Sequence, residues 1–251
     1  MSSNHLEAIL FDFDHTLAHL GNFMRWDDAR DELLRLYSSK GVPETFLEAH
    51  SGAMGLYRDV ATCGLLNDTE LRAIQQKASR ILEVLESEAI SRTFMLPAAV
   101  EFVRHLPRLG LRAGIVTSNA VPVVSAILTR DGVAAAFEAV VGRDDVERLK
   151  PSPEGMLLCC ERMKVPPHRC ITVGDMVGDI AAGLAAEIVA FGVRGGMASD
   201  VQLRDAGAEA VLDDVNDLLK VLNCRSPFPS LKLDSPRLPP ARGGPSSGAA
   251  V

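Results

Sequence analysis

Short apolar runs and longer amphipathic stretches alternate along most of this chain. The apolar runs have the length and the β-branched or aromatic content of buried strands, and the stretches between them repeat apolar residues at helical spacing. The expected strands are Ile9–Phe13, Arg112–Thr117, Ala139–Val141, Ile171–Val173 and Ile188–Val193. Strands that alternate with helices form parallel sheets covered by helices on both faces. We therefore expect an α/β fold with a doubly wound, Rossmann-like parallel sheet.

One long segment, residues 18–94, interrupts this alternation because it contains only helical patterns. A first helix is expected up to Gly41, and a second from Pro43 to about Cys63. Asn67, followed three residues later by Glu70, resembles a capping box that begins a long third helix with a continuous apolar stripe. The segment is predicted to be an all-helical domain inserted after the first strand, with residues 1–17 and 95–222 forming the core.

The composition changes again at the end of the chain. Residues 223–251 are rich in Pro, Ser and Gly and have too little apolar surface for a packed element, so we expect a disordered tail. Pro236 to Pro239 forms a P-x-x-P pattern that could bind a polyproline-recognising domain. Such patterns are common by chance in proline-rich tails, and a solvated tail is the favoured interpretation.

Composition excludes several classes of protein. Of the 251 residues 47% are hydrophobic and 24% charged, as in ordinary globular proteins, and the net charge of -7 argues against a nucleic-acid partner. No apolar run reaches the roughly 18 residues of a membrane helix, and the first residues lack a signal pattern. We expect a cytoplasmic protein without a membrane partner.

The cysteines are odd in number and lack C-x-x-C spacing, which predicts reduced, mostly buried thiols at Cys63, Cys159, Cys160, Cys170 and Cys224.

Two acids, Asp12 and Asp14, stand at the end of the first expected strand. Because side chains alternate along a strand, both should point to the same side, at the edge where α/β sheets bind ligands. Carboxylates this close repel each other and need a cation or a shared proton. Mg²⁺ is a hard cation of the suitable kind, although two aspartates at a strand end can also be simple turn formers or caps.

A second pair of acids, Asp175 and Asp179, follows the expected strand Ile171–Val173. Four residues apart, they face the same direction if a helix begins there. One cation shared between the two pairs would neutralise both.

Two hydroxyl residues stand at the end of the expected strand Arg112–Thr117, and a lysine elsewhere in the chain precedes a proline. Thr117 and Ser118 offer hydroxyls, and the turn before a helix that starts near Pro122 offers backbone amides; together these can hold an anion, or they can be a simple N-cap. Lys150 precedes a proline, which favours an extended backbone, and a surface position is the default for a single lysine.

With these residues in order, the chain resembles the haloacid dehalogenase superfamily of phosphate-transferring hydrolases, in particular its phosphoglycolate phosphatase-like members. The resemblance implies a doubly wound core, and it implies that residues 18–94 are the helical cap of that family. The four motifs that carry it are D-x-D-x-T at Asp12, Asp14 and Thr16, the strand end at Thr117 or Ser118, Lys150, and G-D-x-x-x-D at Gly174, Asp175 and Asp179.

Two positions depart from the family pattern. Relatives commonly have glycine directly after the second acid of the first motif, and His15 in its place changes how tightly that turn can bend. Glycine is also usual at the position of Glu187, so we expect the end of that helix to be capped in another way. Neither position takes part in the chemistry, but His15 could narrow the substrate site.

The resemblance also implies roles for the motif residues. Asp12 is the expected nucleophile, which forms an aspartyl-phosphate, and Asp14 the expected general acid and base. Mg²⁺ is expected between Asp12, the Asp14 carbonyl and Asp175, with Asp179 as an outer ligand or orienting group. The expected phosphate-binding residues are Thr16, Thr117, Ser118 and Lys150, with Thr117 fitting the second motif better than Ser118.

These assignments predict a Mg²⁺-dependent phosphatase that hydrolyses a small phosphorylated metabolite. A phosphomutase of the β-phosphoglucomutase type and a non-catalytic binding protein of the same fold are the alternatives. The motifs leave the substrate and the oligomeric state open, because specificity lies in cap residues without a recognisable motif. Arg25 and Arg58 are candidate cap residues for substrate contact.

Overall fold

A computed structural model describes residues 5–64 and 66–223 of the chain. Its six strands form one sheet in the order β3-β2-β1-β4-β5-β6, and every neighbouring pair is parallel. The strands are β1 (Ala8–Phe11), β2 (Arg112–Val116), β3 (Ala139–Val141), β4 (Cys170–Gly174), β5 (Val189–Val193) and β6 (Val211–Leu212). The predicted doubly wound sheet is confirmed, although β1 ends at Phe11, before both aspartates.

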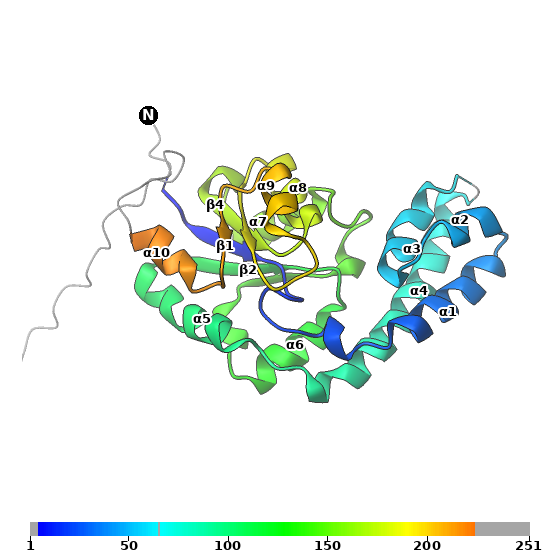
Figure 1. Cartoon of the computed structure of the whole chain (residues 1–251), viewed down its shortest axis with the longest axis horizontal. Coiled ribbons are helices and arrows are strands. Elements are labelled where there is room, and N and C mark those ends of the chain that lie inside the picture. Colours follow the sequence, from blue (N-terminus) through cyan, green and yellow to red (C-terminus); the bar gives the residue numbers. More distant parts are fainter. Residues whose placement is uncertain (1–4, 65, 224–251) are drawn as a thin grey trace, which may run out of the picture.

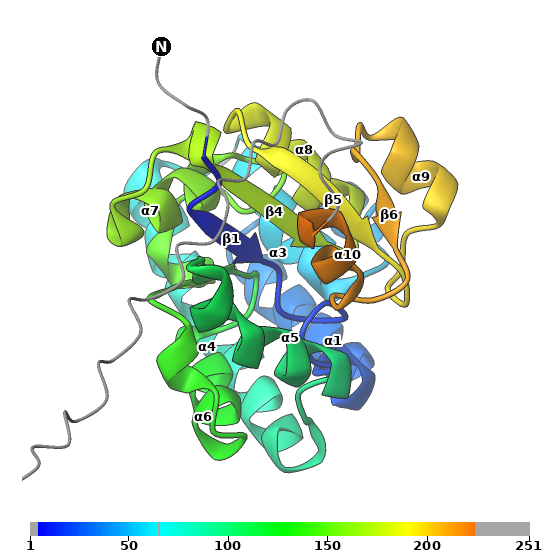
Figure 2. The ribbon, with the colours of Figure 1, turned by 90° about the vertical axis from the view of Figure 1, so that its left-hand side faces the viewer.

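Helices cover both faces of the sheet (Figures 1 and 2). One face packs against α5 (Pro97–Leu109), α6 (Val121–Arg130) and α10 (Asp217–Asn223), and the other against α7 (Glu154–Met163), α8 (Val177–Ala185) and α9 (Asp200–Asp205). Along β1, Ile9 and Phe11 belong to the first core, and Ala8 and Leu10 to the second. Strands buried on both faces read as continuous apolar runs, which is why the sequence reveals them so clearly.

The strand register brings the candidate site residues to one edge of the sheet. Phe11, the last residue of β1, pairs with Ile115 of β2 on one side and with Val173 of β4 on the other. The residues that follow these three central strands therefore lie side by side at the carboxyl edge, where open α/β sheets bind ligands.

The helical insert contains α1 (Trp26–Ser38), α2 (Glu44–Glu48), α3 (Ala53–Asp59) and α4 (Asp68–Ala89). The predicted capping box is confirmed: the Asn67 side chain accepts from the backbone of Glu70, whose carboxylate accepts from the Asn67 backbone. The single second helix predicted from Pro43 to Cys63 is wrong. The chain leaves the helix after α2, because Gly52 adopts an extended conformation and begins α3 anew.

The long helix α4 joins the insert to the sheet-bearing part. It packs against α1 in the insert, and against α6 and the turn Arg143–Asp145 on the other side. Figure 1 shows α4 running from beneath the sheet into the separate group of helices at the right. The insert thus lies beyond the carboxyl edge of the strands, and its division from the core at residues 18 and 94 stays a prediction.

Both departures from the family pattern have a left-handed backbone. His15 has φ 60° and Glu187 has φ 61°, in the region where glycine is free of steric cost. The expectation that the helix before Glu187 is capped in another way is wrong, because Glu187 itself adopts the conformation that glycine usually supplies. Each residue holds a backbone conformation that costs about 1–2 kcal/mol for a side chain with a Cβ.

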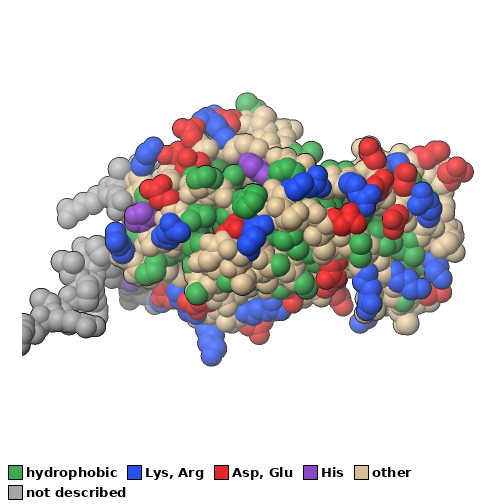
Figure 3. Space-filling view, turned by 90° about the horizontal axis from the view of Figure 1, so that it is seen from below, with side chains coloured by type: hydrophobic (Ala, Val, Ile, Leu, Met, Phe, Trp, Pro, Cys, Tyr) green, Lys and Arg blue, Asp and Glu red, His purple; other side chains and the backbone are tan. Residues whose placement is uncertain are grey.

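Other predictions concern the surface and the ends of the chain. Among the residues described, no helix has both the length and the apolar character needed to cross a membrane. Acidic and basic side chains are interspersed on the face in Figure 3.

Free thiols occur at Cys63, which is half-buried, and at the buried Cys159, Cys160 and Cys170. Cys224, the predicted tail beyond Asn223 and its P-x-x-P pattern lie outside the described residues.

Candidate active site

Three carboxylates meet at the carboxyl edge of the sheet. Asp12 follows β1, Asp175 follows β4, and Asp179 lies in the first turn of α8. Their exposed fractions are 7%, 2% and 2%, and one oxygen from each lies within 4.8 Å of the others. Three of the four acids that were predicted to share a cation therefore lie together, and the shared cation stays a prediction.

Lys150 connects these carboxylates. Its Nζ lies 2.5 Å from Asp12 Oδ1 and 2.5 Å from Asp179 Oδ1, and it donates to the Val116 carbonyl at 3.0 Å. The side chain is only 10% exposed, so the interpretation of Lys150 as an ordinary surface lysine is wrong. One ammonium compensates one of the three carboxylates and leaves an excess of negative charge, which a divalent cation would neutralise.

Burial and crowding shift the ionisation of the cluster. Burial raises the pKa of Asp12 well above its usual value, against the effect of Lys150. Burial, together with the neighbouring Asp179, raises the pKa of Asp175 to about 6. Burial would lower the pKa of the Lys150 ammonium, but the carboxylates of Asp12 and Asp179 outweigh it and raise that pKa. Perturbations of this kind are typical of functional sites.

Backbone and hydroxyl groups fix the position of Asp175. Thr16 Oγ1 donates to Asp175 Oδ1 at 3.4 Å, and Met197 N donates to Asp175 Oδ2 at 3.4 Å. A Cβ at Gly196 would lie 1.8 Å from Asp175 Oδ2, so this approach of the backbone requires glycine. Thr16, expected to bind phosphate, therefore contacts a candidate metal ligand.

Asp179 is oriented by the start of α8. The helix begins at Val177, two residues later than the spacing of the two acids suggested, and Asp179 Oδ2 accepts a hydrogen bond from Met176 N at 2.9 Å. Its other oxygen contacts Lys150. The cluster thus forms although only one of the two acids is on the helix.

Asp14 is held apart from the three clustered carboxylates. Both of its oxygens accept from Gly21 N, at 2.9 and 3.0 Å, and its side chain is 21% exposed. The strand alternation that was expected to align Asp12 with Asp14 does not apply, because β1 has already ended. Asp14 is therefore the acid most accessible to a substrate, and its carboxylate is outside the candidate metal cluster.

The three buried carboxylates fit a magnesium ion. They supply hard oxygen donors close enough to share one cation, as Mg²⁺ prefers, and they carry uncompensated negative charge. The Asp14 carbonyl stays a predicted ligand.

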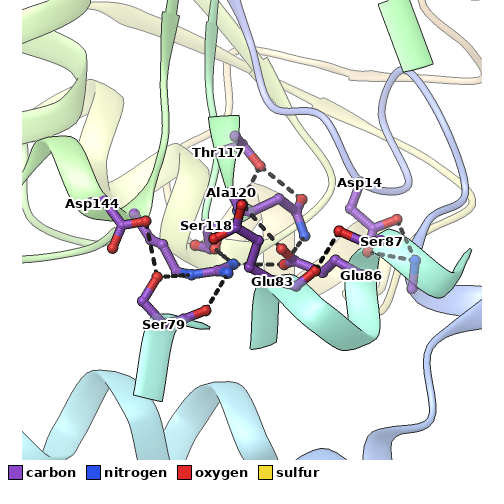
Figure 4. Close-up of polar contacts among 12 residues, drawn as sticks. Asp14, Ser79, Glu83, Glu86, Ser87, Thr117, Ser118, Ala120 and Asp144 are labelled. Carbon is purple, nitrogen blue, oxygen red and sulfur yellow. Dashed lines mark hydrogen bonds and ion pairs between the residues drawn. The ribbon is translucent and has the colours of Figure 1, made fainter. Parts of the chain in front are cut away.

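The second-motif loop, residues 117–120, follows β2 and lies beside Lys150, which donates to the carbonyl of the residue before it. Figure 4 shows the polar contacts of this loop. Thr117 Oγ1 donates to Asn119 Oδ1 at 2.9 Å and accepts from Asn119 N at 3.1 Å. The first residue before α6 is Ala120, which has no side-chain cap, so the N-cap interpretation of Thr117 and Ser118 is wrong. Ser118 lines a small cavity together with Thr117 and Lys150.

The sequence interpretation missed Glu86 and Arg143. They form an ion pair of 2.6 Å between α4 and the turn after β3, with side chains 1% and 0% exposed. Glu86 stands among Leu82, Leu85 and Ala89 on the buried face of α4, where a charged residue is unusual. Its place within that apolar stripe is the signal by which the sequence could have revealed it.

A cleft of about 480 Å³ separates the insert from residues 143–149 of the core. Arg58 lines it, whereas Arg25 is outside its lining and pairs with Asp28 and Glu88. The structure thus separates the two candidate substrate residues. Residues 146, 148 and 149 line both this cleft and the small cavity beside Lys150, so the cleft adjoins the site.

Comparison with known proteins agrees with this arrangement. Residues 6–187, more than half of the chain, match the haloacid dehalogenase-like hydrolases. The chain belongs to this family. The phosphoglycolate phosphatase of Escherichia coli (strain K12) is 33% identical over 130 residues, which are 52% of this chain and 52% of that protein. The match therefore spans about half the length of this relative.

Solved structures share the fold of this haloacid dehalogenase-like hydrolase. A hydrolase from Pseudomonas syringae aligns with 88% of this chain and 99% of its own, with a TM-score of 0.63 and 21% identity. CbbY from Rhodobacter sphaeroides, in complex with phosphate, aligns with 85% and 96%, with a TM-score of 0.57 and 22% identity. At these identities the likeness concerns the fold alone.

Proposed function

We propose that this hydrolase is a Mg²⁺-dependent phosphatase that cleaves a small-molecule phosphomonoester through an aspartyl-phosphate at Asp12. The observation that carries the proposal is the contact of Lys150 with both Asp12 and Asp179 inside a buried group of three carboxylates. A buried ammonium next to a carboxylate opposes the effect of burial on that carboxylate and offers positive charge to phosphoryl oxygens. The partial match to a phosphoglycolate phosphatase supports the same reaction class.

The proposed reaction has two displacements. Asp12 Oδ attacks phosphorus, the bond to the ester oxygen breaks, and Asp14 donates a proton to the leaving oxygen. Asp14 then accepts a proton from water, which attacks phosphorus and releases phosphate from Asp12. The separation of the two acids suits these different roles, because Asp12 is buried against Lys150, whereas Asp14 is only half-buried and is held by Gly21.

The carboxylates of Asp12, Asp175 and Asp179, with the Asp14 carbonyl, would hold Mg²⁺. The ion would supply charge neutralisation for the attacking carboxylate and the phosphoryl oxygens. Lys150, Thr117 and Ser118 are the proposed phosphoryl-binding groups. Thr16 donates to Asp175, and we therefore assign it to positioning that ligand in addition to the predicted phosphate contact.

The substrate is proposed to be a phosphorylated metabolite. A cleft of about 480 Å³ is within the usual range of about 300–1,000 Å³ for small-molecule sites. Arg58, Arg72 and Arg148 line it, and they are candidates for contact with the part of the substrate that leaves.

The experiment is a screen of purified protein against a panel of phosphomonoesters, with free phosphate and phosphorylated isomers measured together. Stoichiometric phosphate release that is lost with a chelator and restored by Mg²⁺ supports the proposal. Isomer formation that requires a bisphosphate primer, with little free phosphate, would indicate the phosphomutase. Binding without turnover of any ester would indicate the non-catalytic alternative.

A further inference from the structure

The junction between α4 and the core contains a largely buried polar network (Figure 4). Glu86 of α4 uses both carboxylate oxygens toward the core. Its Oε1 accepts from Asn119 Nδ2 at 3.0 Å and from Arg143 Nη1 at 2.6 Å, and its Oε2 accepts from Ala120 N at 3.1 Å. A helix from the insert therefore holds the loop that begins at Thr117.

Arg143 fixes Glu86 in this position. The guanidinium also contacts α4 about two turns earlier, where Nε donates to Ser79 Oγ at 2.8 Å and Nη2 donates to the Ser79 carbonyl at 2.9 Å. Ser79 Oγ in turn donates to Asp144 at 2.9 Å. Two points of α4 are thus tied to one turn of the core, so the loop contacts of Glu86 depend on how α4 is seated.

Glu86 also determines which way the Asn119 amide faces. The amide nitrogen must point to the carboxylate, and the amide oxygen then points to Thr117, from which it accepts a hydrogen bond. Thr117 Oγ1 is held independently by Asn119 N. The hydroxyl hydrogen can therefore turn from Asn119 to a phosphoryl oxygen while the Thr117 oxygen stays in place.

We propose that Glu86 is a positioning residue for the phosphate-binding loop, and that it acts through Asn119 on the Thr117 hydroxyl. The seating of α4 on the core then prepares the loop for the phosphoryl group. This inference rests on the proposed phosphatase function. It adds a residue of the insert to the catalytic arrangement, although Glu86 itself does not contact the substrate.

The test uses Glu86→Gln in the full chain with p-nitrophenyl phosphate as substrate and Mg²⁺ present. A glutamine amide has one oxygen and one nitrogen, and its nitrogen cannot accept a hydrogen bond. That nitrogen must face either the N–H of Ala120, or the N–H groups of both Asn119 and Arg143, so at least one contact is lost. We expect kcat to fall about ten- to a hundredfold, the effect of losing a hydrogen bond to a charged group. Activity is measured at a temperature where circular dichroism shows every variant folded.

Glu83→Gln is the matched control. Glu83 is on the same helix, and its carboxylate has no hydrogen bond or ion pair with any residue in the described part of the chain. Its kcat should equal that of the wild type. Equal activity of the two glutamine variants would overturn the inference, because a residue that only stabilises the fold lowers the melting temperature without changing the kcat of folded protein.

A double-mutant cycle tests the route through Thr117. Thr117→Val should lower kcat, and adding Glu86→Gln should produce little further loss, because the first change already removes the group that Glu86 positions. Additive losses, or an unimpaired Thr117→Val, would contradict the inference.

If Glu86→Gln does not fold, Asn119→Ala provides the same comparison, because it leaves the Glu86–Arg143 pair intact. Asn119→Ala should lower kcat to a similar extent, again without an additive effect on Thr117→Val. Wild-type protein that hydrolyses no ester would contradict the proposed function together with this inference, whereas an active wild type with unimpaired Asn119→Ala would contradict the inference alone.

Discussion

Gly21 donates its backbone N–H to both carboxylate oxygens of Asp14, at 2.9 and 3.0 Å. It is the first residue of the short 3-10 turn Gly21–Phe23, which leads from the core into the helical insert. A backbone group at the start of the insert therefore orients the proposed general acid. The insert takes part in two separate contacts with the site, here at Asp14 and through Glu86 at the second-motif loop.

Replacing Gly21 by alanine should impair catalysis. The added Cβ would lie 2.4 Å from Asp14 Oδ2, so the carboxylate must move away from the amide that holds it. We expect kcat to fall about ten- to a hundredfold, within the range that general acid–base catalysis contributes. The measurement is steady-state hydrolysis of the best ester from the screen.

Gly52→Ala is the matched control for this change. Gly52 has φ -113°, which suits any residue, and a Cβ there meets no atom within 4 Å. Its kcat should be that of the wild type. A similar loss in both glycine variants would argue against a specific effect on Asp14.

Asp12→Asn should abolish turnover while the protein stays folded. The amide has nearly the shape of the carboxylate but cannot attack phosphorus. Lys150 keeps its contact with Asp179, so the core retains a compensated charge pair. Phosphate release and the far-ultraviolet circular dichroism spectrum check the two parts of this prediction, and ordinary activity in the variant would contradict the assignment of the nucleophile.

The metal-free protein should lose stability through Asp175 as the pH rises. Its pKa is about 6 in the folded state and close to 3.9 when unfolded, so the folded state retains a proton that the unfolded state releases. This contribution is fully present below the unfolded pKa and is lost as the pH rises through about 6. Asp175→Asn does not titrate at this position, so in the presence of a chelator it should be more stable than the wild type at pH 7.5. The free energy of unfolding of the variant, taken relative to that of the wild type, should be about 1–3 kcal/mol higher at pH 7.5 than at pH 5.

Mg²⁺ should reverse this order at pH 7.5. Binding stabilises the folded state and requires ionised carboxylates, so the wild type should gain more melting temperature than Asp175→Asn. Melting curves of both proteins at the two pH values, with chelator or with Mg²⁺, supply the measurement. An equal gain in both would show that Asp175 is not a ligand.

Glu187→Gly should stabilise the protein without altering activity. Glu187 has a left-handed backbone and an exposed side chain, so glycine relieves steric strain at the cost of a more flexible unfolded chain. The net gain should be about 0.5–1 kcal/mol, or roughly 1–4 °C in melting temperature for a domain of this size. Glu187→Ala retains the Cβ and the strain, and it should bring no such gain.

Much of the architecture follows from local patterns. The strands before Asp12 and Asp175 are buried on both faces, so their apolar runs are continuous and easy to recognise. The capping residue Asn67 marks the start of a helix by its own chemistry, and that helix begins where expected. The break at Gly52 escaped prediction, because nothing in the flanking helical pattern distinguishes an interrupted helix from a continuous one.

Residues that follow parallel strands must meet at one edge of the sheet, and local sequence was therefore sufficient to predict that Asp12, Asp175 and Asp179 converge. Contacts between distant segments have no such local rule. The contact of Lys150 with Asp12, the hold of Gly21 on Asp14 and the burial of Glu86 against Arg143 depend on how the loops and the insert pack on the finished sheet. The sequence specifies which side chains are present, but tertiary packing determines their partners. A buried charge is stable only where the folded structure brings an opposite charge or a hydrogen-bond donor to it.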